Sequence, residues 1–135
     1  MKVLAADPNK CLGCRICEQW CSMFHFRVNN PKKSRISVVR SHETYMDYPF
    51  SCQQCADTPC IKACPVKIQA LSVDENTGAI KVDEEKCIAC GLCVKACPNQ
   101  AIKKHPTEKH MLICDLCGGD PQCVKHCPGD ALFYN

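Results

Sequence analysis

Four cysteines between residues 87 and 98 have the spacing that an iron–sulfur cluster requires. The run Cys87-x2-Cys90-x2-Cys93-x3-Cys97 is followed at once by Pro98. In bacterial ferredoxins this spacing binds a [4Fe–4S] cluster, because three closely spaced cysteines wrap one loop around three corners of a cube, and the fourth reaches the other cluster of a pair. A chance sequence rarely places four cysteines in this way, so the run strongly indicates an iron–sulfur site.

The same arrangement recurs three more times, so the chain carries four complete cysteine quartets. The gaps within them alternate between short and long, which indicates duplicated ferredoxin-like material. In the third quartet Gly91 is expected to let the backbone pass close to the inorganic core, where a Cβ would crowd it. The other quartets are Cys11, Cys14, Cys17 and Cys21; Cys52, Cys55, Cys60 and Cys64; and Cys114, Cys117, Cys123 and Cys127.

Cysteine is also the unusual component of the overall composition. Sixteen of the 135 residues are cysteines, whereas aromatic residues make up only 6%. A core of Leu, Ile and Phe would be thin at this length, so inorganic clusters are expected to occupy part of the interior. Disulfides and zinc are the alternatives. Disulfides belong to oxidising compartments, and zinc sites do not need a third cysteine at the same spacing.

The N-terminal sequence and the charge of the chain lead to expectations about location and partners. The first eight residues contain no apolar core of a secretory signal, and no stretch approaches the length of a membrane span. A cytoplasmic location without direct membrane insertion is therefore expected. The formal net charge is +3 with neutral thiols. Each loaded site carries about −2, so four sites would give a total of about −5, and nucleic-acid binding is not expected.

Short elements are expected between the quartets. The helical segment at Cys21 should continue to Phe26, because Asn29 and the residues after it stop a helix. β-branched residues predict a strand and, further on, a hairpin with Gly78 at its turn. The expected elements are a helix over 18–26, a strand over 35–40, an irregular loop over 41–50, hairpin strands over 70–73 and 79–82, and a connecting loop over 103–110.

Several side chains outside the quartets are candidates for roles near the clusters. Trp20 adjoins a cysteine and is expected to cover a cluster edge, with direct participation in electron transfer as the alternative. Lys62, Lys95 and Lys125 each stand two residues before the last cysteine of a quartet. They form either a solvated helix face or a set of charges that favours the reduced state. The scattered histidines are expected at the surface or beside a cluster, not in catalysis: His25, His42, His105, His110 and His126.

These cysteines, the widened gaps of the second and fourth quartets, and the helix that continues past Cys21 without a proline resemble one known family. The chain looks like the four-cluster iron–sulfur subunits of the dimethyl sulfoxide reductase type, from Cys11 to Leu132. Such subunits also serve formate dehydrogenases, nitrate reductases, hydrogenase complexes and carbon monoxide dehydrogenases. The resemblance implies an α+β class and a tandem, loop-rich, bacterial-ferredoxin-like fold with short helices and β-hairpins, organised around four [4Fe–4S] clusters.

The resemblance also implies which cysteines share a cluster. The first quartet pairs with the fourth and the second with the third, so residues 1–44 with 105–135 would form an outer two-cluster domain, and residues 45–104 an inner one. No ligand is replaced, so no [3Fe–4S] site is expected. The implied ligand sets are Cys11, Cys14, Cys17 and Cys127 (cluster 1); Cys21, Cys114, Cys117 and Cys123 (cluster 2); Cys52, Cys55, Cys60 and Cys97 (cluster 3); and Cys64, Cys87, Cys90 and Cys93 (cluster 4).

The leading functional hypothesis is a non-catalytic electron-transfer subunit, in which closely spaced clusters pass single electrons. The substrate chemistry would lie in a large catalytic oxidoreductase subunit. The chain lacks the C-terminal extension of larger family members, and compact versions accompany tungsten- or molybdenum-pterin aldehyde oxidoreductases, so such a partner is favoured. A ferredoxin or a flavin- or NAD-linked subunit would be the electron-transfer partner on the other side.

Two other hypotheses compete with this one. A free-standing polyferredoxin would have the same fold, but the loops over 27–50 and 103–113 exceed what a minimal carrier needs. A radical enzyme that uses S-adenosylmethionine would need Cys-x3-Cys-x2-Cys, and the required third positions hold other residues: Phe24, Lys67, Gln100 and Asp130. The radical-enzyme class is therefore excluded. The sequence shows no nucleotide-binding glycine loop and no nucleophile–base pattern.

Overall fold

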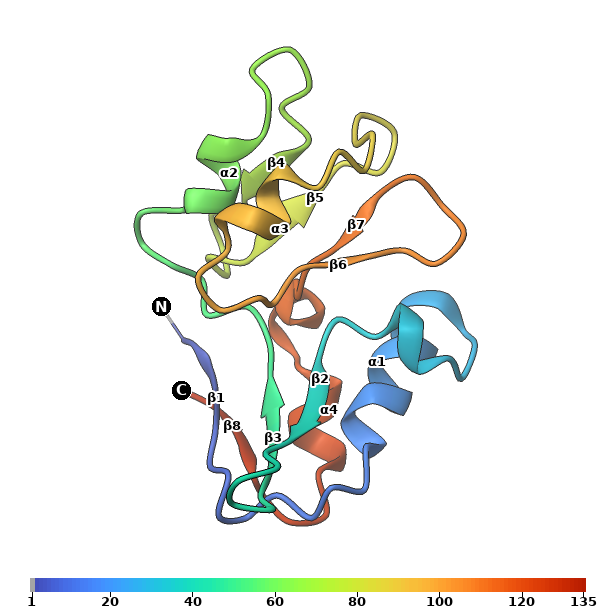
Figure 1. Ribbon diagram of the computed structural model, residues 1–135, viewed down its shortest axis with the longest axis vertical. Helices are drawn as coiled ribbons and strands as arrows, with labels where there is room; N and C mark the ends of the chain where they lie inside the picture. Colours follow the sequence, from blue (N-terminus) through green and yellow to red (C-terminus); the bar gives the residue numbers. More distant parts are fainter. Residues whose placement is uncertain (1) are drawn as a thin grey trace.

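The computed structural model describes residues 2–135 and has two tiers joined by a short ribbon (Figure 1). The upper tier in Figure 1 contains α2, α3 and the β4–β5 hairpin, and the lower tier contains α1, α4 and two further ribbons. The elements are β1 Leu4–Ala6, α1 Ile16–Phe26, η1 Pro31–Lys33, β2 Ser37–Arg40, β3 Asp47–Phe50, α2 Pro59–Ala63, β4 Leu71–Val73, β5 Ile80–Val82, α3 Leu92–Ala96, β6 Lys103–Lys104, β7 Met111–Leu112, η2 Leu116–Gly119, α4 Gln122–His126 and β8 Leu132–Tyr134.

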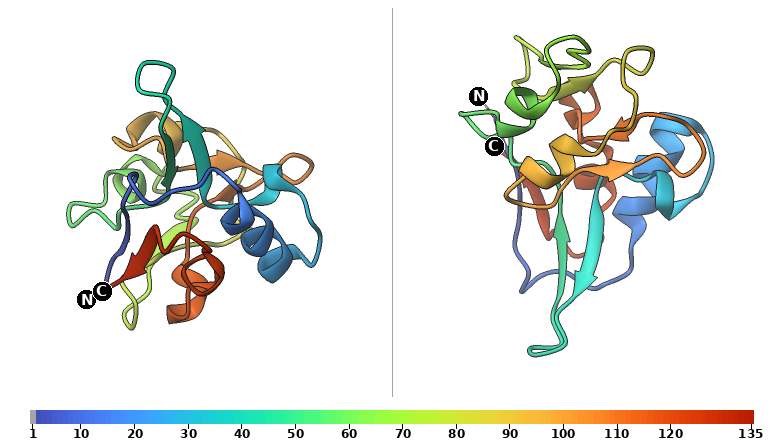
Figure 2. Two further views of the ribbon diagram at one scale, coloured as in Figure 1. Left: turned by 90° about the horizontal axis from the view of Figure 1, so that it is seen from below. Right: turned by 45° about the horizontal axis from the view of Figure 1, so that its top comes forward.

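Helix packing joins segments that are far apart in the sequence. Helix α1 packs against α4, and α2 packs against α3. We call α1 and α4 with β1, β2, β3 and β8 the α1–α4 half, and α2 and α3 with β4 and β5 the α2–α3 half. The two chain ends meet in the first of these, because β1 and β8 pair antiparallel with Leu4 opposite Tyr134 (Figure 2, left). The sequence analysis did not anticipate this ribbon.

Helix α1 confirms the helix expected after Cys21 and begins two residues earlier, at Ile16. Glu18 lies in its first turn, where a negative charge is favourable to the helix dipole. The helix ends where Arg27 takes a left-handed conformation and donates its N–H to the carbonyl of Met23 at 2.9 Å. At 11 residues it is the longest helix among the described residues, and it spans the third and fourth cysteines of the first quartet.

The hairpin predicted around Gly78 is confirmed. Strands β4 and β5 pair antiparallel with Leu71 opposite Val82. Gly78 has a φ of 75°, a conformation that glycine adopts without the steric cost of a Cβ. The hairpin is closed by Asp74, whose carboxylate accepts from the Asn76 N–H at 2.8 Å.

Two loop predictions are wrong in part. The segment expected to be irregular over 41–50 ends in β3, which pairs antiparallel with β2, and β2 begins at Ser37, not at residue 35. Pro49 obscured this strand, because proline lacks the N–H that most strands need, but a two-stranded ribbon has free edges that tolerate it. An ion pair between Arg40 and Asp47 at 3.1 Å links the two strands at the turn end of the ribbon.

The connecting loop expected over 103–110 is shorter than predicted. Its first two residues form β6, which pairs with β7, so that Lys103 lies opposite Leu112. Two adjacent lysines carry no strand signal, and their partner strand β7 consists of the buried residues Met111 and Leu112. This ribbon lies between the two tiers (Figure 1).

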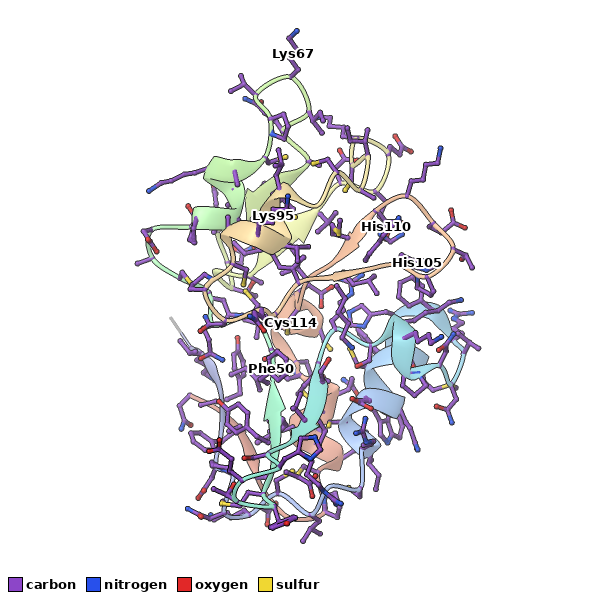
Figure 3. All side chains as sticks on the ribbon, viewed as in Figure 1. Phe50, Lys67, Lys95, His105, His110 and Cys114 are labelled. Atoms are coloured by element: carbon purple, nitrogen blue, oxygen red, sulfur yellow. The ribbon has the colours of Figure 1, made fainter. Side chains whose placement is uncertain are left out.

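Cysteines take part in both apolar cores of the described chain. The core of the α1–α4 half combines aliphatic residues such as Leu4 and Ile36 with three buried cysteines. The second core, under the α2–α3 half, likewise combines Leu71 and Ile80 with three buried cysteines. Cys114 packs against both cores and lies at the junction of the two tiers (Figure 3). The interior is therefore built in large part around sulfur.

Candidate iron–sulfur centres

Each of the four helices positions the last two cysteines of one quartet. Cys17 and Cys21 both lie within α1. In the other three quartets the third cysteine is the second residue of a five-residue helix, and the fourth is the residue that follows it. Pro65, Pro98 and Pro128 come next in the sequence, where proline cannot continue a helix. The short helices therefore fix the direction in which the fourth sulfur points.

The loop between the first two cysteines of each quartet has the same backbone bend. Its second residue is left-handed in all four quartets, with φ values of 71°, 48°, 57° and 57° at Gly13, Gln54, Ala89 and Leu116. In the first and third quartets another left-handed residue follows two positions later, at Arg15 and Gly91, whereas in the fourth quartet Cys117, Gly118 and Gly119 are all left-handed. Alternation of the kind seen in the first and third quartets turns successive N–H groups toward one centre and forms the anion-binding concavity found at many iron–sulfur sites. The sequence signalled this bend only where glycine occurs.

Gly91 shows why glycine is used there. Its φ of 82° places it in the left-handed region at the start of α3. A Cβ built on it would meet no protein atom within 4 Å. The backbone conformation, not crowding by protein atoms, therefore accounts for this glycine in the structure. Gly13 differs, because a Cβ there would collide with the carboxylate of Asp47.

Two small cavities are each lined by four cysteines from two quartets. One is lined by Cys11, Cys14 and Cys17 from the first quartet and by Cys127 from the fourth, together with apolar side chains. Its counterpart in the α2–α3 half is lined by Cys52, Cys55, Cys60 and Cys97, the last of which belongs to the third quartet. These groupings coincide with two of the ligand sets implied by the family resemblance.

Cys21 shares an apolar core with Cys123 of the fourth quartet, and Cys114 packs against the same core. Burial raises the pKa values of the Cys114, Cys117 and Cys123 thiols, and a negative charge on Cys21 raises each of them further. The pKa of Cys117 reaches about 11. Neutral thiols are thus favoured without iron, so cluster assembly should release protons.

The remaining cysteines gather in the α2–α3 half. Burial, with smaller contributions from charges on Cys87 and Cys90, raises the pKa of Cys93 to about 11. Cys64, which follows α2, packs against the same apolar core as Cys87. Cys90 is exposed, so this loop faces solvent.

Backbone N–H groups donate to several of the cysteine sulfurs. Ala101 donates to Cys97 at 3.4 Å and Ala131 donates to Cys127 at 3.3 Å, at equivalent positions four residues further on. Such bonds stabilise negative charge on sulfur and are one means by which a protein sets a cluster potential. Four-cysteine cavities, convergent N–H groups and N–H bonds to sulfur together fit a [4Fe–4S] cluster.

His25 is a functional residue whose role the sequence analysis left undefined. It lies four residues after Cys21 on α1, and its imidazole is buried between the Cys21 carbonyl and Asp115. The i, i+4 spacing on a helix could have indicated this contact. His25, Asp115 and Cys117 also form a cluster of candidate metal ligands. Because Cys117 belongs to a quartet, this cluster is part of the same centre.

Trp20 stacks on His126 and bridges α1 and α4. The ring centroids are 3.6 Å apart and the rings are nearly parallel, at 4°. Each ring immediately precedes a cysteine, Cys21 or Cys127. Trp20 remains 40% exposed, so one face of the stack meets solvent. The stacked pair therefore covers the contact between α1 and α4.

Most of the other lysines and histidines singled out from the sequence lie at the surface, and two of the histidines pack against each other. Lys62, Lys95 and Lys125 are exposed, and Lys125 pairs with Asp120 at 2.6 Å. His105 and His110 are buried beside each other on the β6–β7 ribbon, with centroids 4.8 Å apart. His42 is exposed on the β2–β3 turn.

Comparisons with known proteins identify a family. Residues 43–135 match the family described as "4Fe-4S dicluster domain". The aliphatic sulfonate oxidoreductase polyferredoxin-like subunit of Pyrococcus furiosus is 49% identical over 89% of this chain and 68% of its own length. The B component of the polysulfide reductase of Wolinella succinogenes is 32% identical over 95% of this chain and 72% of its own length.

Longer relatives and a solved structure agree with this assignment. The chain spans only 29% of the NADH-dependent phenylglyoxylate dehydrogenase subunit beta of Aromatoleum evansii, with 36% identity. The BamBC active-site complex of benzoyl coenzyme A reductase contains a chain that superposes with a TM-score of 0.59 and 31% identity, over all of this chain and 76% of that one. Within residues 2–135, no helix combines the length and the apolar character that crossing a membrane requires. The chain belongs to the 4Fe-4S dicluster domain family of iron–sulfur electron-transfer subunits.

Proposed function

We propose that this chain is a non-catalytic subunit that carries electrons through four [4Fe–4S] clusters between a catalytic oxidoreductase subunit and an external carrier. The observation that carries the proposal is the pair of cavities lined by four cysteines each, one in each half. When bound, each cluster would supply a one-electron centre. The protein's own residues then hold the centres, exclude water and set their potentials.

The ligand assignment in this proposal is the crossed one. Helix contacts support it, because α1 packs on α4 and α2 packs on α3, so that the two quartets of each pair lie close enough for each to supply its fourth cysteine to the other. We accordingly propose an outer domain of residues 1–44 with 105–135 and an inner domain of residues 45–104, whose first strand, β3, pairs with β2 of the outer domain. The proposed ligands are Cys11, Cys14, Cys17 and Cys127; Cys21, Cys114, Cys117 and Cys123; Cys52, Cys55, Cys60 and Cys97; and Cys64, Cys87, Cys90 and Cys93.

The two halves would form one continuous path for electrons. Cys114 supports this, because it packs against the apolar cores of both halves. At either end, cysteines reach solvent: Cys14 in the α1–α4 half and Cys90 in the α2–α3 half. These exposed loops would be the points where electrons enter and leave.

The catalytic partner in this proposal is a tungsten- or molybdenum-pterin oxidoreductase such as an aldehyde oxidoreductase, in the cytoplasm. The name of the Pyrococcus furiosus relative supports a subunit of an oxidoreductase, since that protein is called a polyferredoxin-like subunit of one. A ferredoxin or a flavin- or NAD-linked subunit would exchange electrons at the other end. The reducing compartment fits sixteen cysteines that are held as metal ligands and not as disulfides.

The test is anaerobic purification of the chain from its native host, with identification of co-purifying chains and metal analysis. A large chain with tungsten or molybdenum, and about sixteen irons on this subunit, is the expected result. Nickel would instead indicate a hydrogenase or carbon monoxide dehydrogenase partner. A loaded chain that co-purifies with no other would favour a free-standing polyferredoxin and overturn the subunit proposal.

A further inference from the structure

Three charged side chains gather beside the sulfur of Cys21. His25 Nε2 lies 2.8 Å from Asp115 Oδ1, and an Arg35 guanidinium nitrogen lies 3.3 Å from Asp115 Oδ2. The backbone N–H of Arg35 donates to the Cys21 sulfur at 3.1 Å, and His25 Nδ1 lies 3.7 Å from the same sulfur. These side chains are largely buried, with exposed fractions of 8% for His25, 13% for Arg35 and 30% for Asp115.

The net charge of this group is +1. Arg35 is permanently cationic, and its guanidinium also donates to the Ile113 carbonyl at 3.1 Å. Both ring nitrogens of His25 face oxygens that can only accept, the Cys21 carbonyl at 2.8 Å and the Asp115 carboxylate at 2.8 Å. An imidazole donates from both nitrogens only as the imidazolium cation. Two cations therefore stand against the one carboxylate of Asp115.

No other quartet has an equivalent group among the described residues. The position four residues after the last cysteine, where Cys21 has His25, holds Ile68, Ala101 or Ala131 in the other three. The backbone N–H groups of Ala101 and Ala131 bond to sulfur, but these residues bring no charge.

We propose that Arg35, with His25 and Asp115, gives the cluster held through Cys21 the highest reduction potential of the four, so that an electron rests there as it crosses the chain. The proposal rests on the ligand assignment made under Proposed function. When bound there, the cluster would accept one electron from a reduced neighbouring cluster and pass the same electron on, with no bond or proton exchanged. The fixed positive charge stabilises the reduced form, which carries one more negative charge.

The test is a redox titration of the full, cluster-loaded chain, followed by electron paramagnetic resonance with dithionite as the reductant. Arg35→Gln removes a cation but keeps the backbone N–H to Cys21, so the highest of the four potentials should fall. Asp115→Asn removes the anion and keeps an oxygen acceptor, so the same potential should rise. Each change is expected to alter the ratio of reduced to oxidised cluster about tenfold at a fixed potential, which is about 59 mV for one electron.

Lys32→Gln is the matched control, because it removes an exposed cation only three residues from Arg35 and should leave all four potentials unchanged. Shifts of the same sign in Arg35→Gln and Asp115→Asn, or a shift in any potential other than the highest, would overturn the inference. If the Arg35→Gln chain loses iron, the Asp115→Asn chain decides the test by itself. A highest potential that stays unchanged in the Asp115→Asn chain counts against the proposal.

Loss of the Cys21 ligand separates this inference from the proposed function. Cys21→Ala should remove the highest-potential signal and about four irons of about sixteen. If a lower-potential signal disappears instead, the inference is wrong and the four-cluster function stands. A wild-type chain that binds only two clusters would overturn the proposed function, and the inference with it.

Discussion

Each half of this molecule contains two packed helices that carry cysteines, and the α1–α4 half has a longer helix and larger side chains at the helix contact. In the α2–α3 half both helices have five residues, and the residues before the last cysteines are Ala63 and Ala96. In the α1–α4 half α1 extends to 11 residues, and the same two positions hold the stacked rings of Trp20 and His126. A pair of cysteine-bearing helices therefore needs only alanines at this contact.

The additions to the α1–α4 half must serve something other than forming a pair of clusters. The long helix carries His25 to the Cys21 sulfur, and the segment that follows brings Arg35 to the same place. In the α2–α3 half the groups that bond to cysteine sulfurs are uncharged: the N–H groups of Gln54 and Ala101, and the side-chain amide of Asn99. In the proposed function, the repeated cysteines would supply the ligands, and the residues added in the α1–α4 half would distinguish one centre from another.

Iron removal is expected to have the largest effect and to affect both halves. Cysteines form part of both apolar cores, so chelation of iron under anaerobic conditions should unfold the chain. Near-ultraviolet circular dichroism reports the whole molecule, and the fluorescence of Trp20, the one tryptophan in the sequence, reports the α1–α4 half. A native-like dichroism spectrum after chelation would contradict this prediction. Trp20 fluorescence that shifts while dichroism persists would show that the halves unfold separately.

Replacement of the fourth cysteine of one quartet should affect a cluster whose other three ligands belong to a different quartet. Cys127→Ala is expected to remove the cluster held by Cys11, Cys14 and Cys17, and so about four of about sixteen irons. Cys97→Ala should have the matching effect in the α2–α3 half. Iron analysis and electron paramagnetic resonance measure both, and Val66→Ala, at a position that is 82% exposed and outside both four-cysteine cavities, is the control that should keep all its iron. Loss of the Cys114 centre in Cys127→Ala would disprove the crossed ligation.

The sequence predicted the elements that are set locally. Helix α1 and the β4–β5 hairpin follow from stop signals and turn chemistry within a few residues, and both are confirmed. The strands it missed are two to four residues long and are held by partners elsewhere, as β1 is by β8 at the other end of the chain. Such strands have almost no local signal, because their stability comes from tertiary packing.

The features of the candidate site also fall into two groups: those that local sequence predicts and those that only the fold shows. Cysteine spacing identified the quartets, because a cluster requires specific intervals along one loop. The left-handed residues Gln54 and Leu116 had no signal, since neither is glycine. The contact between Arg35 and Asp115 joins residues that are distant in sequence, so only the fold reveals it. The assignment of cysteines to clusters remains a prediction.

The Trp20–His126 stack should contribute moderately to stability. Trp20→Ala is expected to lower the free energy of unfolding by about 1–2 kcal/mol, less than for a buried tryptophan, because Trp20 is 40% exposed. With His126→Ala, a double-mutant cycle should give a coupling of about 1 kcal/mol. Thermal melting followed by cluster absorbance measures both. Met23→Ala on the same helix, at 44% exposure, should show no coupling to His126. Additive effects of Trp20→Ala and His126→Ala would show that the stack is not a stabilising contact.

The smallest expected effects come from two equivalent backbone positions, one in each half. Ala89 has a φ of 57° where Gly13 has 71°. Ala89→Gly should therefore stabilise the chain by about 1 kcal/mol, since a left-handed alanine is strained and a glycine is not. Gly13→Ala should destabilise it by more than this, because the new Cβ would also press on the Asp47 carboxylate that anchors the β2–β3 ribbon. Melting of the two loaded variants measures the difference. If the two variants shift the melting temperature by equal and opposite amounts, the φ angle alone accounts for both effects. The contact between the new Cβ at position 13 and Asp47 would then cost no stability.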